Sequence, residues 1–312
     1  MSPVAPLKQR IYRRKGGGGG HGDADGGDSG GDSGGDGGGD TGDSGDKGGD
    51  SKGEDVPVSG STDGESDAVA YDAGGGKSVT IPQGQPFAGR TSGGGTRGEV
   101  YRTSEYGSGY PDLSAGSVSG RDFPFVFWPV VWRSPGYGAP YLYDPEYGTP
   151  WNTSRPGGPL AEATFTSNTA NSTFYVIADN STVTSLITSI SKNCSSSIGG
   201  ASSTVPTPFN ATASEPQPEQ AVQYYRASSV TLLLDGYNNT DALAPGSGNA
   251  SATAVPLPGW VDSSLLECLN DTIGEAAPLF SGGAPTLARV HVTNFVPILV
   301  MGWFMWKFCR DV

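Results

Sequence analysis

STFYVIADNSTVTSLITSI, residues 172–190, decides the fold. It begins with aromatic and β-branched residues typical of a strand, which end at Ala178. Its later apolar residues follow helical spacing: Val183, Leu186, Ile187 and Ile190. A strand would place Leu186 and Ile187 on opposite faces, so a helix is favoured. Its start can be capped by Asn180, Ser181 or Thr182. With a further strand expected at residues 163–166, the stretch predicts strands followed directly by a helix.

A similar order recurs further along the chain. Residues 221–237 predict one long strand, because they are rich in Val, Tyr, Thr and Leu. Residues 262–273 predict a helix whose apolar face holds Leu265, Leu266, Leu269 and Ile273. Ser264 and Glu267 have capping-box spacing, and Gly274 suits a helix end. The pattern predicts an α+β fold, a small β-sheet with two helices on one face, and it suggests a duplicated strand–helix unit.

Composition limits how much of the 312-residue chain folds. Only 35% of the residues are hydrophobic, and Gly 50 with Pro 24 make up nearly a quarter, a level typical of disorder. A basic start is followed by 14 acidic residues against two lysines over residues 16–70. Because an acidic chain repels phosphate, we expect no nucleic-acid partner. The regions expected are a disordered basic and then Gly/Asp-rich spacer (1–74), a Gly- and aromatic-rich extended segment partly packed on the module (75–149), a glycosylated α+β module (150–280), a linker (281–289) and a C-terminal hydrophobic helix (290–308).

The N-glycosylation sequon, Asn-x-Ser/Thr, occurs eight times in the module, where about three are expected by chance. The sequon asparagines are Asn152, Asn171, Asn180, Asn193, Asn210, Asn238, Asn249 and Asn270. Two of these sequons are less suited to glycosylation, because Cys194 follows Asn193 and because Asn270 lies on a predicted helix. Glycosylation requires exposure to a lumenal compartment, so we expect N-linked glycans and an extracytoplasmic module.

Cysteine usage agrees with that compartment. Cys194 and Cys268 fall at corresponding places in the two predicted strand–helix units, and Cys309 follows the apolar tail. An oxidising compartment would pair the first two as a disulfide. Two reduced, buried cysteines are the alternative. The chain has no CxxC or zinc-ligand spacing, so we expect neither a metal site nor a cofactor.

An aromatic segment, FPFVFWPVVW, occupies residues 123–132. It is too short to cross a bilayer, and its prolines disfavour a helix. The favoured interpretation is an extended segment that packs across the sheet, because buried aromatic side chains supply much of a small core. The alternative is a candidate ligand surface for sugars, formed by Phe125, Phe127, Trp128 and Trp132.

The C-terminal tail, FVPILVMGWFMW at residues 295–306, has no charge. Extended to residues 290–308, a helix would reach about 28 Å, close to a bilayer core. Two kinds of membrane tether are open: a short transmembrane helix, or a cleaved lipid-anchor signal. A buried core helix is a third possibility. Because residues 1–19 contain no apolar signal segment, we expect the natural start to lie upstream.

Several segments carry a resemblance to a known family. They include IPQGQPFAGRTSGGGTR, YGSGYP, GRDFPFVFWPVVW, PQPEQAVQYYRASSVTLLLDGYNNT and SLLECLNDTIGEAAPL. Over about residues 57–280 the chain resembles uncharacterised secreted or membrane-attached proteins of mushroom-forming (basidiomycete) fungi. The resemblance implies a signal sequence and a hydrophobic C-terminus, and it implies no functional residue.

Catalysis is not expected. His21 lies in the acidic tract and His291 beside the tail, so the module has no histidine to act as a base or ligand. Asp179 and Asp235 end the two predicted strands, but such residues are more often turn or cap residues. We therefore expect no catalytic residue and a non-enzymatic, membrane-tethered glycoprotein of the cell surface, plasma membrane or cell wall. The alternative is an extracellular module that binds carbohydrate or peptide through the aromatic segment.

Overall fold

The computed structural model describes residues 53–59, 65–113, 116–132, 140–240 and 255–281. The fold is α+β, as predicted. Its strands and α-helices are β1 (Asp55–Pro57), β2 (Asp67–Val69), β3 (Val79–Thr80), β4 (Thr91–Ser92), β5 (Leu160–Thr166), β6 (Thr173–Asp179), α1 (Asn180–Asn193), β7 (Thr207–Pro208), β8 (Ala221–Tyr225), β9 (Val230–Leu234) and α2 (Ser263–Ala276). Short 3-10 helices are η1 (Arg97–Glu99), η2 (Pro140–Tyr143), η3 (Pro145–Tyr147) and η4 (Pro218–Gln220).

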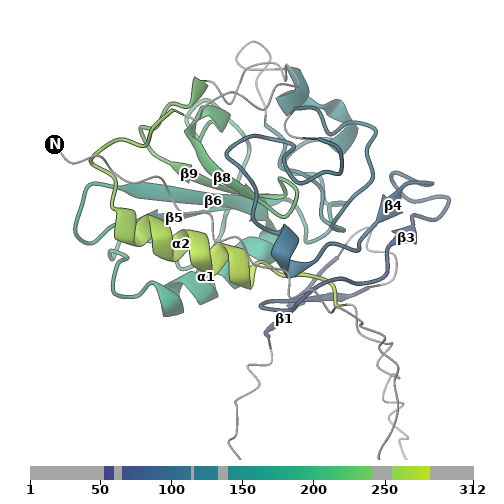
Figure 1. Cartoon of the computed structure of the whole chain (residues 1–312), viewed down its shortest axis with the longest axis horizontal. Coiled ribbons are helices and arrows are strands. Elements are labelled where there is room, and N and C mark those ends of the chain that lie inside the picture. Colours follow the sequence, from purple (N-terminus) through teal and green to yellow (C-terminus); the bar gives the residue numbers. More distant parts are fainter. Residues whose placement is uncertain (1–52, 60–64, 114–115, 133–139, 241–254, 282–312) are drawn as a thin grey trace, which may run out of the picture. The chain divides into compact units, whose positions relative to one another are not determined.

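The main sheet has five strands in the order β7-β5-β6-β9-β8, and each neighbouring pair is antiparallel (Figure 1). The register places Ala163 opposite Val176, and Val176 opposite Leu232. Beyond β8, the Arg102 amide donates to Tyr224 O at 3.1 Å. The β8 edge is therefore bonded along part of its length, which protects it from pairing with another chain.

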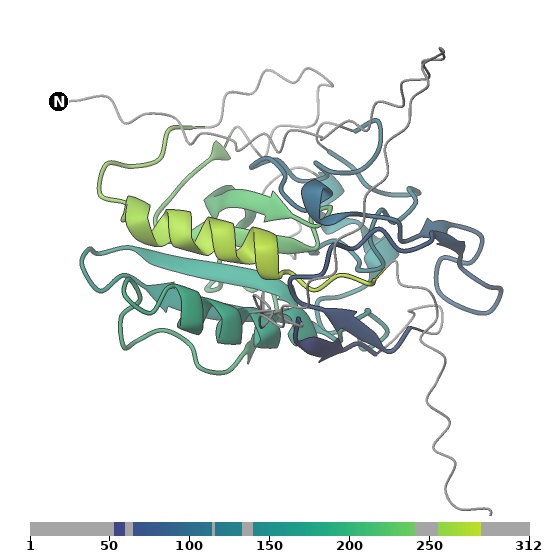
Figure 2. The same ribbon diagram turned by 60° about the horizontal axis from the view of Figure 1, so that its bottom comes forward.

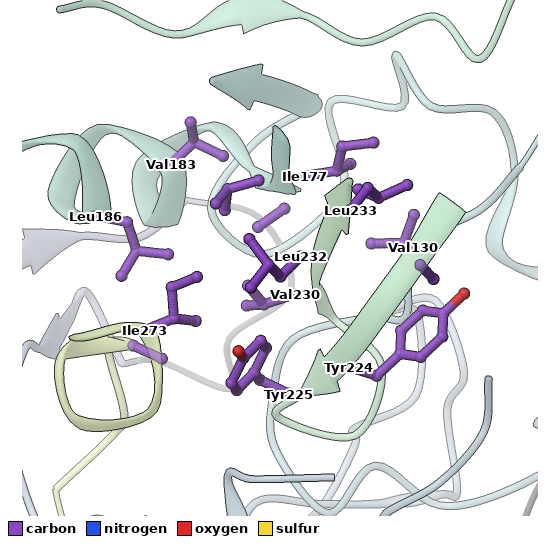
Figure 3. Close-up of a cluster of buried hydrophobic side chains, with 14 of the residues drawn as sticks. Val130, Ile177, Val183, Leu186, Tyr224, Tyr225, Val230, Leu232, Leu233 and Ile273 are labelled. Atoms are coloured by element: carbon purple, nitrogen blue, oxygen red, sulfur yellow. The ribbon is translucent and has the colours of Figure 1, made fainter. Parts of the chain in front are cut away.

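Both α-helices lie along one face of the sheet (Figures 1 and 2). Because side chains alternate along a strand, Val230 and Leu232 point to the same face as Tyr225. Figure 3 shows these side chains facing Leu186 of α1 and Ile273 of α2. All five are at most 1% exposed, so the helices and sheet share a dry core.

The aromatic segment covers part of the opposite face. Val130 lies against Tyr224 and Leu233 in Figure 3. The ring of Tyr106 meets that of Tyr224 edge-on, with the centroids 5.7 Å apart. Val130 also donates its amide hydrogen to Ser228 O at 2.8 Å. The segment is thus part of the core, as the favoured interpretation proposed.

The long strand predicted at residues 221–237 is wrong, because the chain reverses in the middle of it. β8 and β9 form a hairpin whose turn has left-handed backbone at Arg226 (φ 47), Ala227 (φ 48) and Ser228 (φ 59). The turn contains none of the usual Gly, Pro or Asn signals. Contacts of the buried Arg226 side chain, described below, hold it instead.

The helix ends also differ in detail from the prediction. Asp179, the residue before α1, accepts from the Thr182 amide at 2.9 Å, so Asn180, Ser181 and Thr182 are not the cap. Asp262 caps α2, which makes the predicted Ser264–Glu267 capping box wrong. α2 also continues past Gly274.

Gly274 is required by packing. A Cβ atom there would lie 1.9 Å from Cζ of Tyr101, so only glycine allows the ring to lie against the helix. The glycine that suggested a helix end therefore marks a close approach between α2 and a neighbouring segment.

Strands are present before the predicted boundary at residue 74. β1 and β2 pair with Asp55 opposite Val69, although composition placed both strands in the spacer. Val58, Ala68 and Phe127 form a small hydrophobic cluster of buried side chains. Residues 1–52 lie outside the described residues.

The predicted C-terminal helix, residues 290–308, lies outside the described residues, as does the linker beyond Ser281. Among the helices that the structure describes, none combines the length and apolarity needed to cross a bilayer.

Candidate functional site

Seven of the eight sequon asparagines lie in the described part of the chain. The exposed ones are Asn171, Asn180, Asn193, Asn210 and Asn238. Asn152 and Asn270 are half-buried, and Asn249 lies outside the described residues. Asn270 Oδ1 accepts a hydrogen bond from the Tyr225 hydroxyl at 2.7 Å. Five sequon asparagines are thus exposed in the folded state, although Asn193 Nδ2 donates a hydrogen bond to the Tyr71 hydroxyl at 3.1 Å. Asn270 is half-buried and its side chain is bonded to Tyr225.

The structure contains the predicted disulfide between Cys194 and Cys268, with their Cα atoms 5.8 Å apart. It joins α1 to α2 and closes a separation of 74 residues. The two cysteines are not at corresponding places, because Cys194 directly follows α1 whereas Cys268 lies inside α2. The bond therefore fixes the helix pair over the sheet, and it limits how a transferase reaches Asn193 next to Cys194.

The four aromatic side chains considered as a ligand surface are buried in the structure. Phe125, Phe127, Trp128 and Trp132 are at most 4% exposed. Phe87 and Phe280 pack against Trp128 and Phe127, with ring centroids 4.7 and 5.6 Å apart. These aromatic side chains belong to the core because large apolar rings are costly to leave in water.

Asp179 and Arg226 form a buried ion pair that the sequence pattern did not reveal. Arg226 Nη2 lies 2.8 Å from Asp179 Oδ2, and the side chains are 0% and 4% exposed. Arg226 also donates to Pro278 O at 2.9 Å, and its guanidinium lies 3.5 Å from the centroid of the Phe127 ring. Burial lowers the pKa of Arg226, and the Asp179 carboxylate opposes that shift. The pair ties the start of α1 to the β8–β9 turn.

Asp179 and Asp235 do not meet. Asp179 ends β6, whereas the Asp235 amide donates to Thr173 O at the other end of the same strand. Seven residues of β6 separate the two carboxylates, about 20 Å of strand. Among the described residues, no group of three His, Cys, Asp or Glu side chains is arranged to hold a metal ion.

An open groove of about 580 Å³ lies on the sheet face opposite the helices, near the β5 side. Glu162 in β5 and Tyr175 in β6 line it, together with residues 213–217, 219–220 and 235–238. Its walls carry carboxylates, amides and tyrosines: Glu162, Glu215, Glu219, Asp235, Gln217, Gln220, Asn238, Tyr175 and Tyr237. Trp260, 45% exposed, lies against Gly236 at the edge of this groove. Hydrogen-bonding groups and aromatic side chains thus converge on one hollow, whose mainly polar wall suits a polar ligand rather than an apolar one.

Glu162 is the electrostatically unusual group of this groove. Its Oε2 atom is buried and has no hydrogen-bond partner among the described residues. Two effects raise the pKa of Glu162 from 4.5 to about 7: burial, which is the larger, and repulsion from Glu215. The groove therefore holds a carboxyl group that takes up a proton near neutral pH.

Replacing Glu162 by Gln tests this electrostatic environment through the pH dependence of stability. The folded state binds the Glu162 proton more tightly than the unfolded chain, so its contribution to stability falls as pH rises from about 4.5 to 7. Glu162→Gln should therefore gain stability relative to wild type over that range. Urea unfolding at several pH values measures it, and parallel pH profiles of the two proteins would contradict it.

A smaller cavity of about 180 Å³ lies between Gly93–Gly95 and Leu279–Ser281, and it is lined by Phe125 and Phe127. Its volume would hold one small molecule, since an apolar cavity of about 150 Å³ holds benzene. The 580 Å³ groove offers the larger space for a ligand.

Comparison of the chain with protein-family models, curated proteins and solved structures finds no match to any of them.

Proposed function

We propose that the chain is a non-enzymatic, N-glycosylated protein tethered to a membrane at the cell surface or cell wall. The observation that carries the proposal is the Cys194–Cys268 disulfide, which joins two helices of the core. Disulfides of this structural kind form in oxidising compartments, where N-linked glycans are also attached. The five exposed sequons and the resemblance to secreted or membrane-attached fungal proteins point in the same direction.

The tether in this proposal is the apolar tail at residues 290–308, as a transmembrane helix or as a lipid-anchor signal. We also propose that the module arose by duplication. β5, β6 and α1 occur in the same order as β8, β9 and α2, and the two hairpins meet where β6 pairs with β9.

Enzymatic removal of N-linked glycans tests the proposal. The protein from its own cells should lose several kDa on treatment, since each N-glycan adds about 2 kDa to a sequon. Asn180→Gln and Asn171→Gln should each remove one step of the mobility shift, because these side chains are exposed. Asn270→Gln is the matched control and should remove none, because its side chain is engaged with Tyr225. A protein that carries no glycan would overturn the proposal.

A second candidate function is carbohydrate binding in the 580 Å³ groove. It replaces the buried aromatic segment as the ligand surface. Sugar hydroxyls both donate and accept hydrogen bonds, which suits the carboxylates and amides of the wall. Tyr175 in the lining offers a flat apolar face against which a sugar ring packs, and so does the exposed Trp260, which lies against the lining residue Gly236. Asn238 lies on the rim, so a glycan there would narrow the entrance.

Titration of the deglycosylated protein with soluble oligomers of glucose and of N-acetylglucosamine tests this second function. Tyr175→Ala and Trp260→Ala should each weaken binding about tenfold, as expected for truncating an aromatic anchor. Tyr71→Ala is the control, because Tyr71 is also exposed, at 42%, but its hydroxyl accepts a hydrogen bond from Asn193 at the end of α1, and Tyr71 is not among the groove residues. Absence of binding, or equal losses in all three variants, would exclude the groove as a sugar site.

A further inference from the structure

Arg155, in the loop that precedes β5, is a second buried arginine. Its side chain is among the largest that the core encloses, and the residue is 1% exposed. Nη2 donates to Trp128 O at 3.0 Å and to Pro129 O at 2.6 Å. The guanidinium carbon lies 5.7 Å from the centroid of the Trp128 ring. These contacts hold one end of the guanidinium against the aromatic segment.

The rest of this guanidinium has no acceptor. Nε and Nη1 of Arg155 are buried and lack a hydrogen-bond partner among the described residues. A guanidinium is a donor only, so it cannot satisfy these groups by accepting a bond. The Tyr110 hydroxyl, 4% exposed, is also buried without a partner in the described part of the chain. Buried donors are nearly always bonded, so these atoms indicate a ligand that accepts hydrogen bonds.

The balance of buried charges indicates that this ligand is negatively charged. Asp179 is the carboxylate that acts most strongly on Arg155, but it is already bonded to Arg226 at 2.8 Å. One carboxylate therefore faces two buried guanidinium groups. The neighbouring tyrosines supply no compensating charge, because burial raises the pKa of Tyr106 and Tyr110 well above the usual value. A buried charge without compensation strongly disfavours the folded state.

We propose that the interior beside Arg155 binds a small inorganic anion, such as chloride. The anion accepts hydrogen bonds from the free Nε or Nη1 groups of Arg155 and balances the excess positive charge. A water molecule could accept the same hydrogen bonds but would leave the charge uncompensated. The proposal does not rest on glycosylation or on sugar binding, since Arg155 is enclosed by the core.

Crystals of the full chain grown in bromide test the site directly. Bromide gives anomalous scattering and replaces chloride in halide sites. The expected result is an anomalous peak within hydrogen-bonding distance, about 3.3 Å, of Arg155 Nε or Nη1. Ordinary water density there, without an anomalous signal, would overturn the proposal.

Thermal unfolding of the full chain gives a second test that separates specific binding from adventitious binding. At equal ionic strength, chloride at ten times its Kd should raise the Tm of wild type by about 3–6 °C over gluconate, which is a much larger anion. Arg155→Met should lose this difference, and Lys192→Met, at an exposed lysine on α1, should keep it.

Equal Tm values of wild type in chloride and gluconate would show any bromide peak to be an adventitious ion only, and would overturn the proposal. Should Arg155→Met fail to fold, the wild-type Tm difference and the bromide peak decide the matter without it.

Discussion

Asp179→Asn should lower the free energy of unfolding by about 3–5 kcal/mol, since it leaves Arg226 as an uncompensated charge in the core. The substitution keeps the size of the side chain, and asparagine still caps a helix. The loss is therefore assigned to the ion pair, whose atoms lie 2.8 Å apart with both side chains buried. Urea unfolding followed by circular dichroism measures the change.

The matched control is Glu146→Gln. Glu146 pairs with Arg90, but these side chains are 17% and 22% exposed. Because water partly reaches this pair, its loss should cost less than the loss of the fully buried pair, even though Glu146 Oε2 also accepts hydrogen bonds from Ser119 and Gly120. If Asp179→Asn cost no more than Glu146→Gln, the buried pair would not hold α1 to the β8–β9 turn.

Removal of the disulfide is the second large effect. The double variant Cys194→Ser/Cys268→Ser should lose about 4 kcal/mol, because the bond closes a separation of 74 residues. For a domain of this size, the Tm should fall by about 8–16 °C. Calorimetry of wild type with and without a reductant should show the same difference. Cys309→Ser serves as the control and should leave the Tm unchanged.

An unchanged Tm on reduction would contradict a structural role for the bond. It would also remove the observation on which the proposed extracytoplasmic location depends.

The sequence predicts those parts of the fold that depend on local periodicity. The spacing of Val183, Leu186, Ile187 and Ile190 places α1 correctly, because a helix is read from one face of a few turns. Residues 123–132 are buried as their aromatic content suggests. The disulfide follows from there being two cysteines within the module.

The parts that the sequence does not predict depend on contacts between distant residues. The turn at residues 226–229 lacks the Gly, Pro and Asn that most strongly mark a turn in a sequence. The buried Arg226 side chain holds it through Asp179 and Pro278. β1 and β2 lie in a Gly- and Asp-rich region, and contacts with distant residues hold them. Val58 packs with Phe127, and Val69 exchanges backbone hydrogen bonds with Leu279.

The sequence does not predict the groove either, because its walls come from distant parts of the chain. Glu162 and Tyr175 lie on neighbouring strands, but residues 213–217, 219–220 and 235–238 complete the walls from later in the chain. Carboxylates scattered in this way form no motif. A polar Glu162 within the predominantly apolar β5 was the one local signal that could have pointed to it.

The central claim is that residues 150–272 mature in an oxidising compartment where glycans are attached. Its most direct test is peptide mapping of the protein from its own cells, with free thiols alkylated at lysis. The expected result is a disulfide-linked peptide pair containing Cys194 and Cys268, together with glycans on exposed sequons such as Asn180. Alkylated Cys194 and Cys268 with every sequon unmodified would contradict the claim.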